Sequence, residues 1–248
     1  MTAGNIERSL VLIKPDALKN SLTGYILSQF SEFHTGLRFA GLKVVSVNLE
    51  LAEEHYAEHF GKFFYPSLLD YIRGYLHYPD NPEKRRVIAI VYQGVNAIRT
   101  IRDICGPTNP HDARVQRPGC IRALGTVVPL KDETGQYIGD RVDNMIHASA
   151  NPDDAEREVK LWFSPTDLPP VMRGFTTGVS GTYYYYDPAS QKLSGEHKPG
   201  GLCIAGPGTM LWESDLAVLE QSLKGKAPDY PVKAVVAKYL INREGEGS

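Results

Sequence analysis

Short apolar runs recur along the first two thirds of the chain at positions that predict buried strands. A continuous run of Leu, Val and Ile stops at Lys14-Pro15-Asp16, where proline cannot continue a central strand. A second segment alternates in polarity and is rich in valine, which favours a strand as well. A third run is the most uniformly apolar part of the chain. These segments are residues 9–13, 42–51 and 87–92.

Amphipathic segments with helical spacing separate these strands. Apolar residues recur there every three to four positions, which places them on one face of a helix. The segments are residues 22–33, 52–60, 67–76 and 96–104. Further along, we expect a loop over residues 106–120, a hairpin from residues 126–130 and 136–138, and a short strand at residues 145–146. Asn151 and Pro152 are typical of a helix start, and that helix is expected to reach Phe163.

The order of these elements predicts the fold class. Strands interleaved with helices form two split βαβ units, which favours an α+β, ferredoxin-like βαββαβ sandwich, an antiparallel sheet covered by helices.

The last third of the chain differs in composition. Glycine and proline are nearly twice as frequent after residue 164 as before it, which indicates two parts, residues 1–164 and residues 165–248. In the second part, residues 182–187 and 200–208 suit strands, and helices are expected from Ser214 and over residues 232–240. We therefore expect a small mixed C-terminal extension, either a structural appendage or a lid.

Charge and cysteine content exclude several classes of protein. The 27 basic and 29 acidic residues give a net charge of −2, so no overall basic field attracts nucleic acid or an anionic membrane. Three cysteines without a C-x-x-C pair argue against a disulfide framework or a zinc site. The N-terminus has no apolar signal core, and no apolar run approaches the ~20 residues of a membrane helix. We expect a cytoplasmic protein without specific nucleic-acid binding.

Local cations and one histidine are the candidate chemistry. His147 follows a short strand and precedes a helix start, where backbone N–H groups favour an anion, so it could act as a nucleophile toward a phosphoryl group. Basic side chains that suit phosphate oxygens stand near strand and helix ends. They are Lys14, Arg102, Arg114, Arg117 and Arg122.

Several ordered motifs show that residues 5–164 resemble the nucleoside diphosphate kinase family. One N-x-x-H alone would be weak, but the motifs agree in order. They are ERSLVLIKPDA (7–17), GPTNP (106–110), PGCIR (118–122), NMIHASA (144–150) and AEREVKLWF (155–163).

The resemblance implies a reaction and its catalytic residues. The family moves the γ-phosphoryl group of a nucleoside triphosphate to a nucleoside diphosphate by a ping-pong mechanism through a phosphohistidine. By resemblance, His147 is the nucleophile, Glu158 holds its other ring nitrogen, Lys14 contacts the transferring phosphate and Tyr56 supports His147. Mg²⁺ is the implied cofactor, held mainly by the nucleotide phosphates with no dedicated protein ligands.

The resemblance also implies the nucleotide contacts. Arg102, Thr108 and Arg122 would bind the diphosphate, and Asn144 with Lys14 would reach the sugar hydroxyls. Phe64 would stack on the base, with an Ile or Val of the 106–122 loop, such as Val115, on the other face. Stacking without contacts to base edges would accept any base.

Departures from the family pattern leave alternatives open. Ala148 and Ala150 stand where the family usually has Gly and Asp, and the segment between Arg122 and Asn144 is longer than usual. The chain could therefore be an active kinase, a catalytically weak nucleotide-binding or regulatory protein, or an enzyme with altered acceptor choice. The family also implies a homo-oligomer built on a dimer. Apart from His147, we expect the histidines to be surface or packing residues.

Overall fold

A computed structural model describes residues 5–241 of the chain. The chain divides into two compact units, Met1–Val159 and Lys160–Ser248. The division falls within helix α8 (Pro152–Trp162), close to the boundary that composition suggests. Among the described residues, no helix has both the length and the apolar character needed to span a bilayer.

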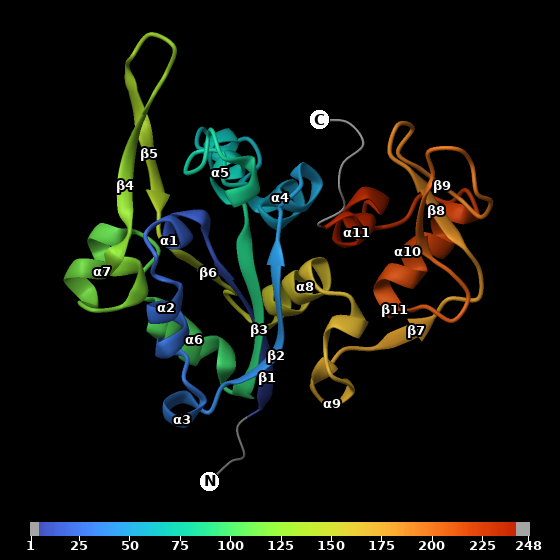
Figure 1. Ribbon diagram of the computed structural model, residues 1–248, viewed down its shortest axis with the longest axis horizontal. Helices are drawn as coiled ribbons and strands as arrows, with labels where there is room; N and C mark the ends of the chain where they lie inside the picture. Colours follow the sequence, from blue (N-terminus) through green and yellow to red (C-terminus); the bar gives the residue numbers. More distant parts are fainter. Residues whose placement is uncertain (1–4, 242–248) are drawn as a thin grey trace. The chain divides into compact units, whose positions relative to one another are not determined.

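A four-stranded antiparallel sheet forms the centre of the first unit (Figure 1). Its strand order is β2-β3-β1-β6, and every neighbouring pair is antiparallel. The strands are β1 (Ile6–Ile13), β2 (Arg38–Val45), β3 (Val87–Val95) and β6 (Ile146–Ala148). This order is that of a ferredoxin-like βαββαβ sandwich, so the predicted fold class is confirmed.

Helices and short helical turns connect these strands. The helices are α1 (Pro15–Lys19), α2 (Thr23–Gln29), α3 (Glu32–Thr35), α4 (Leu49–His55), α5 (Tyr65–Ile72), α6 (Ala97–Cys105) and α7 (Pro110–Gln116). The 3-10 turns are η1 (Ala57–His59), η2 (Pro82–Lys84) and η3 (Ile121–Leu124).

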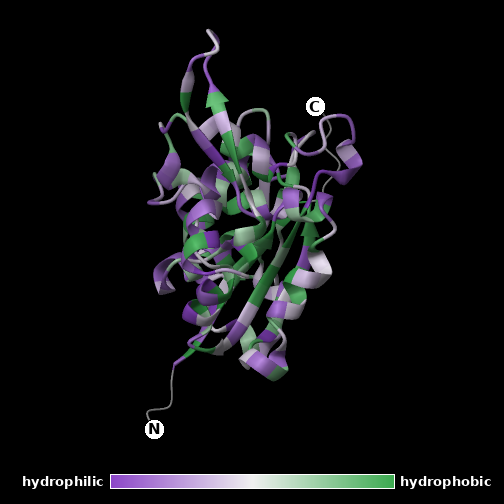
Figure 2. Ribbon diagram, turned by 90° about the vertical axis from the view of Figure 1, so that its left-hand side faces the viewer, coloured by the Kyte–Doolittle hydropathy of each residue, from purple (hydrophilic) through white to green (hydrophobic). Residues whose placement is uncertain are grey.

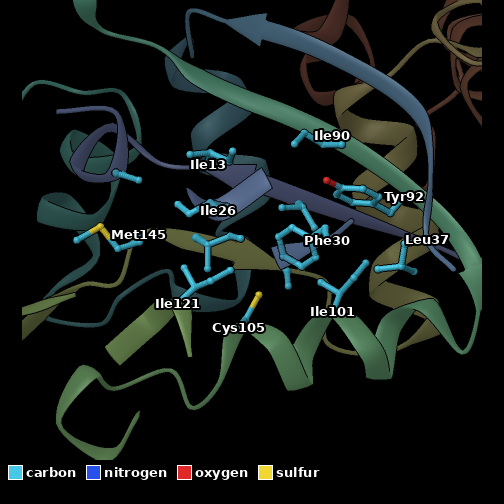
Figure 3. Close-up of a cluster of buried hydrophobic side chains, with 14 of the residues drawn as sticks. Ile13, Ile26, Phe30, Leu37, Ile90, Tyr92, Ile101, Cys105, Ile121 and Met145 are labelled. Carbon is cyan, nitrogen blue, oxygen red and sulfur yellow. The ribbon is translucent and has the colours of Figure 1, made fainter. Parts of the chain in front are cut away.

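The sheet is buried on both faces, which explains why its central strands read as continuous apolar runs. Consecutive residues of β1, from Leu10 to Ile13, are all fully buried, and the middle of the sheet is coloured hydrophobic in Figure 2. On one face, Ile13 and Tyr92 pack with Ile26 and Phe30 of the α2 region and with Ile101 of α6 (Figure 3). This core holds β1 and β6 rigidly, and both strands lead to the site.

Three expectations about elements were wrong. Residues 22–33 do not form one helix, because α2 ends at Gln29 and α3 begins at Glu32. Residues 42–51 do not form one strand: β2 begins at Arg38 and ends at Val45, and α4 begins at Leu49. Asn48 caps that helix by accepting a hydrogen bond from Leu51 N, a signal hidden by the valine-rich alternation before it. The 106–120 loop contains α7, which begins at Pro110 after an Asn109 cap.

The expected hairpin consists of β4 (Thr126–Lys131) and β5 (Tyr137–Asp143). It is the long arm, yellow-green in Figure 1, that extends from the sheet region past α7. Asp132 fixes its turn, because its Oδ1 accepts hydrogen bonds from the backbone N–H groups of Thr134 and Gln136. β5 ends at Asp143 and β6 begins at Ile146, so the hairpin is directly followed in the chain by the strand that carries His147.

The second unit is the expected mixed extension. Its small sheets have the orders β10-β8-β9 and β11-β7, and its core includes Tyr184, Leu211, Leu219 and Val235. The elements are η4 (Pro165–Asp167), α9 (Pro170–Arg173), β7 (Thr177–Val179), β8 (Tyr184–Asp187), β9 (Lys192–Ser194), β10 (Leu202–Ala205), β11 (Met210–Trp212), α10 (Glu213–Leu223), α11 (Val232–Ala237) and η5 (Lys238–Leu240).

Candidate active site

One cavity of about 510 Å³ in the first unit gathers all the site residues expected from the sequence. They come from six separate stretches of chain that the sheet brings together. These residues are Lys14, Tyr56, Phe64, Arg102, Thr108, Arg122, Asn144, His147 and Glu158. The cavity is also lined by residues that the sequence did not single out as functional. Those are His55, Glu58, His59, Leu68, Asp140, Arg141, Val142, Ala148 and Ala150.

His147 and Glu158 form a hydrogen-bonded pair in this cavity. His147 Nε2 lies 2.9 Å from Glu158 Oε2, and the Glu158 side chain is only 5% exposed. Ser149 Oγ donates to the same carboxylate oxygen at 2.6 Å and accepts a hydrogen bond from Leu10 N. The carboxylate is thereby fixed by β6 and α8 together, and it fixes the imidazole in turn.

The charge of Glu158 decides which ring nitrogen of His147 carries a proton. Burial alone would raise the pKa of Glu158, but His147 and the Ser149 hydroxyl outweigh it and lower the pKa to about 2. An ionised carboxylate only accepts hydrogen bonds, so His147 Nε2 must be the protonated nitrogen that donates. Nδ1 of a neutral His147 therefore keeps its lone pair.

An unusual backbone conformation at Met145, immediately before β6, sets the direction in which this strand begins. Met145 has φ of +67°, a left-handed conformation that is strained for a residue other than glycine. Asp16 compensates, because its Oδ2 accepts a hydrogen bond from Met145 N, and Met145 O accepts one from Lys14 N. The Lys-Pro-Asp turn after β1 thus sets the direction of the residues that precede His147.

Two hydrogen bonds connect Lys14, Asn144 and the backbone of Thr108 at the cavity. Lys14 Nζ donates to Asn144 Oδ1 at 2.8 Å, and Asn144 Nδ2 donates to Thr108 O at 2.9 Å. Lys14 is 5% exposed and its ammonium lies 5.1 Å from the centre of the Tyr71 ring. Asn144 therefore joins β1, β6 and the loop that carries Thr108, in addition to lining the cavity.

Arg122 supplies a second buried cation. Its Nη1 donates to Gly106 O at 2.9 Å, and its Nε and Nη2 reach Ile146 O at 3.4 Å. These carbonyl groups hold the guanidinium without neutralising it, so its charge remains available to an anion in the cavity. Arg102, on α6, lines the same cavity and brings a third cation.

Gly106, whose carbonyl oxygen accepts a hydrogen bond from Arg122, has no space for a side chain. It has φ of +82°, and a Cβ there would lie 2.2 Å from Cys120 Sγ. We expect Gly106→Ala to lower the free energy of unfolding by about 3 kcal/mol, through backbone strain plus overpacking. Gly36→Ala is the matched control, since Gly36 has φ of +72° but open space around its Cβ, and we expect about 1 kcal/mol there. Equal losses in urea titrations of the two variants would contradict the steric argument.

Tyr56 and His55 form the aromatic side of the site. The buried Tyr56 hydroxyl has no hydrogen-bond partner among the described residues, and burial raises the pKa of Tyr56, so it keeps its proton. The rings of Tyr56 and His55 pack edge to face with their centroids 4.6 Å apart. The rings of His55 and His147 pack in the same way with centroids 4.5 Å apart. His55 is thus a packing residue, as expected, but it packs against His147, and its only sequence signal is its position before Tyr56.

Phe64 lines the same cavity and immediately precedes α5, and Leu68 of that helix lines it too. Val115 does not line this cavity with it; Val115 is 82% exposed on α7. Three residues of β5 also line the cavity, Asp140, Arg141 and Val142. The stacking partner of Phe64 in the 106–122 loop therefore stays a prediction.

Comparison with protein families gives a match to the model described as "Nucleoside diphosphate kinase" over residues 7–168. Curated relatives agree. A protein of Thermococcus kodakarensis named nucleoside diphosphate kinase is 39% identical over 168 residues, which are 68% of this chain and 83% of the relative. A protein of the same name from Pyrococcus furiosus is 39% identical over 163 residues, 66% of this chain and 86% of the relative.

Solved structures are similar over the same part of the chain. The nucleoside diphosphate kinase of Aquifex aeolicus matches with a TM-score of 0.52 and 30% identity, over 66% of this chain and all of that one. The Borrelia burgdorferi enzyme, solved as a transition-state mimic with bound vanadate and ADP, matches with a TM-score of 0.51 and 29% identity, over 66% of this chain and 90% of that one.

Proposed function

The chain belongs to the nucleoside diphosphate kinase family and is a nucleoside diphosphate kinase, and we propose that it transfers the phosphoryl group through a phosphohistidine at His147. The observation that carries the proposal is the 2.9 Å contact between His147 Nε2 and Glu158 Oε2, in a cavity that Lys14, Arg102 and Arg122 also line. This contact leaves Nδ1 as the nucleophilic nitrogen.

The reaction follows in two balanced steps. His147 Nδ1 attacks the γ-phosphorus of a nucleoside triphosphate, a P–N bond forms, the bond to the bridging oxygen breaks, and a nucleoside diphosphate leaves. A second nucleoside diphosphate then attacks the phosphorus of the phosphohistidine with a terminal phosphate oxygen. A P–O bond forms, the P–N bond breaks, and His147 is regenerated. Glu158 stabilises the positive charge that develops on the imidazole in the first step.

The cations and Tyr56 stabilise the transferring group. Lys14 lies where it can contact the transferring phosphate, and Arg102, Thr108 and Arg122 bind the diphosphate portion. The unpartnered Tyr56 hydroxyl donates to a phosphoryl oxygen beside His147. Positioning and charge are the main contributions in phosphoryl transfer, so these groups do the catalytic work that His147 does not. The Asn144 amide reaches the sugar hydroxyls while holding Lys14.

Mg²⁺ enters this site as part of the substrate. Lys14, Arg102 and Arg122 line the cavity and suit the phosphate groups, so we expect the ion to be held mainly by the nucleotide phosphates. Within residues 5–241, only His55, His147 and Glu158 gather as possible metal ligands, and two of them are the nucleophile and its partner. When bound, Mg²⁺ neutralises charge on the β- and γ-phosphates.

Phosphoenzyme formation tests this proposal directly. The full chain is incubated with Mg²⁺ and ATP labelled on the γ-phosphate, then quenched in acid or alkali. We expect label on the protein that survives alkali and is lost in acid, and that moves to GDP or CDP when either is added. The proposal fails if no such label forms, or if it is stable in acid.

The alternative of a catalytically weak nucleotide-binding or regulatory protein is not favoured. It rested on Ala148, Ala150 and the C-terminal extension. Ala148 is 3% exposed and pairs with Val11 on the neighbouring strand, and the bond between His147 and Glu158 is present beside it. The extra methyl group is accommodated in the core without displacing the nucleophile.

Glu158→Gln probes the charge behind the imidazole. The amide still accepts a hydrogen bond from His147 Nε2 but no longer stabilises the developing imidazolium charge, so we expect the rate of phosphoenzyme formation to fall by ~10²-fold. Ser149→Ala is the milder comparison, because it removes only one of the hydrogen bonds to Glu158. Rapid-quench measurements should rank wild type, Ser149→Ala and Glu158→Gln in that order; equal rates would exclude a role for the charge.

We further propose a homo-oligomer built on a dimer. β2 is an outer strand of the sheet and exposes apolar side chains at Phe39, Leu42 and Val44, an arrangement that favours covering by another chain. Light scattering of the purified chain should give at least twice the mass of 27.5 kDa; a monomer mass would refute the proposal.

A cytoplasmic location remains a proposal that rests on the cysteines. Cys105, Cys120 and Cys203 form no disulfide in the described part of the chain, which is usual in a reducing compartment.

A further inference from the structure

Three side chains at the nucleophile form a cluster of the kind that binds transition metals. One ring nitrogen of His55, one ring nitrogen of His147 and a carboxylate oxygen of Glu158 all lie within 4.8 Å of one another. His55 and Glu158 are buried, and His147 is half-buried. The described part of the chain contains no other group of this kind. The phosphoryl transfer proposed above uses only two of these side chains, which leaves His55 with packing as its only role.

The donor atoms of this cluster match zinc better than magnesium. Two imidazoles and one carboxylate are a three-ligand set that zinc uses in proteins, whereas Mg²⁺ prefers an octahedron of oxygen ligands. The surrounding charge points the same way. Arg157 Nη2 lies 3.6 Å from the Oε1 atom of Glu158, and Lys14 and Arg122 line the cavity. These cations oppose an ion that is held by charge alone, so imidazole nitrogens have to supply most of the binding, and imidazole suits transition metals.

The three side chains need only a small movement to reach one metal ion. Two ligands of a tetrahedral zinc ion are about 3.3 Å apart when each bond is about 2.0 Å long. His147 Nε2 and Glu158 Oε2, at 2.9 Å, are already close to that separation. The rings of His55 and His147 have centroids 4.5 Å apart. The widest separation of ligand atoms therefore has to close from at most 4.8 Å to about 3.3 Å.

Resting on the proposed phosphohistidine mechanism, we propose that His55, His147 and Glu158 bind a zinc ion that inhibits the enzyme reversibly. The ion takes the place of the proton on His147 Nε2, and that proton moves to Nδ1, so the ring stays neutral. Nδ1 then has no lone pair with which to attack the γ-phosphorus. Glu158 is used as a ligand and no longer stabilises the imidazolium charge. Water completes the tetrahedral coordination.

Zinc binding is measured without nucleotide, so this result does not depend on catalysis. Calorimetry of the full chain with zinc chloride should show one tight site per chain. Co²⁺ in place of zinc should give the strong visible absorption of a tetrahedral site, which octahedral Co²⁺ lacks. We expect His55→Gln and Glu158→Gln each to weaken zinc binding by at least ~10- to 100-fold, because each removes a ligand. His59→Gln is the matched control, since His59 lines the same cavity but is outside the cluster, and it should bind zinc as the wild type does.

Inhibition is measured as the rate at which Mg²⁺ and γ-labelled ATP label the protein, with each variant compared with its own zinc-free rate. Free zinc at ten times its Kd should lower the wild-type rate ~10-fold, since only about a tenth of the sites remain empty. EGTA, which binds zinc far more tightly than magnesium, should restore the rate. His55→Gln should resist the same zinc concentration, and His59→Gln should not.

Several outcomes would overturn the proposal. They are equal zinc binding by His55→Gln and the wild type, Co²⁺ without tetrahedral absorption, and unchanged labelling at saturating zinc. Because His55 is buried, Glu158→Gln repeats the binding test at a second ligand should His55→Gln not fold. A wild-type chain that binds zinc but forms no phosphohistidine would instead overturn the proposed function and leave the metal site as an independent result.

Discussion

Replacing His147 with alanine should abolish phosphoenzyme formation and lower nucleotide exchange by at least ~10⁴-fold, because a ping-pong reaction has no other route once its acceptor is gone. The remaining cations would still bind nucleotide. Kd for ADP should therefore stay within a few-fold of wild type, since the diphosphate contacts assigned to Arg102 and Arg122 do not involve the imidazole. The measurement is coupled exchange from ATP to CDP, paired with calorimetric ADP binding.

His111→Ala is the matched control for this loss. His111 is an exposed histidine on α7 and is not among the cavity residues. The control should retain full exchange and full labelling by ATP. If His147→Ala retained labelled protein that is stable to alkali, another nitrogen would be the acceptor, and the assignment of His147 would be wrong.

The fold could be predicted because its strongest signals are local. The strand at residues 87–92 is one apolar run, and in the structure it is the core of β3, buried on both faces. Where two signals compete, the prediction failed. The valine-rich stretch before Asn48 extended the expected strand through the start of α4, since alternation gives no warning of a capping residue inside it.

The candidate site shows the same division between local and non-local information. Residues inside ordered motifs, such as Lys14, Arg122 and His147, could be singled out from sequence, and the structure brings them to one cavity. His55 could not, because its contact with His147 joins positions 92 residues apart and exists only after the sheet forms. Arg141 also lines the cavity but lies outside the motifs that carry the resemblance, so it could not be singled out from the sequence.

Lys14→Met should lower kcat/KM by ~10³-fold, because it removes a fixed positive charge next to the transferring phosphate in a largely buried site. The wild-type charge itself depends on pH. Burial lowers the pKa of Lys14 to about 8, with Asp16 limiting the fall and Arg122 adding to it. Lys14 is therefore protonated below about pH 8 and loses its charge above it.

The sign of the pH effect follows from this protonation. The active form carries the proton on Lys14, so kcat/KM of the wild type should be flat between about pH 7 and 8 and fall roughly tenfold per pH unit above that. Bound phosphates favour the charged form, so the decline in kcat should begin at higher pH than the decline in kcat/KM. Lys14→Arg keeps a charge throughout this range and should lose the alkaline decline, even though its overall rate is lower. A decline at the same pH in Lys14→Arg and wild type would assign it to another group, and a flat wild-type profile up to pH 10 would show that the charge of Lys14 does not limit the reaction.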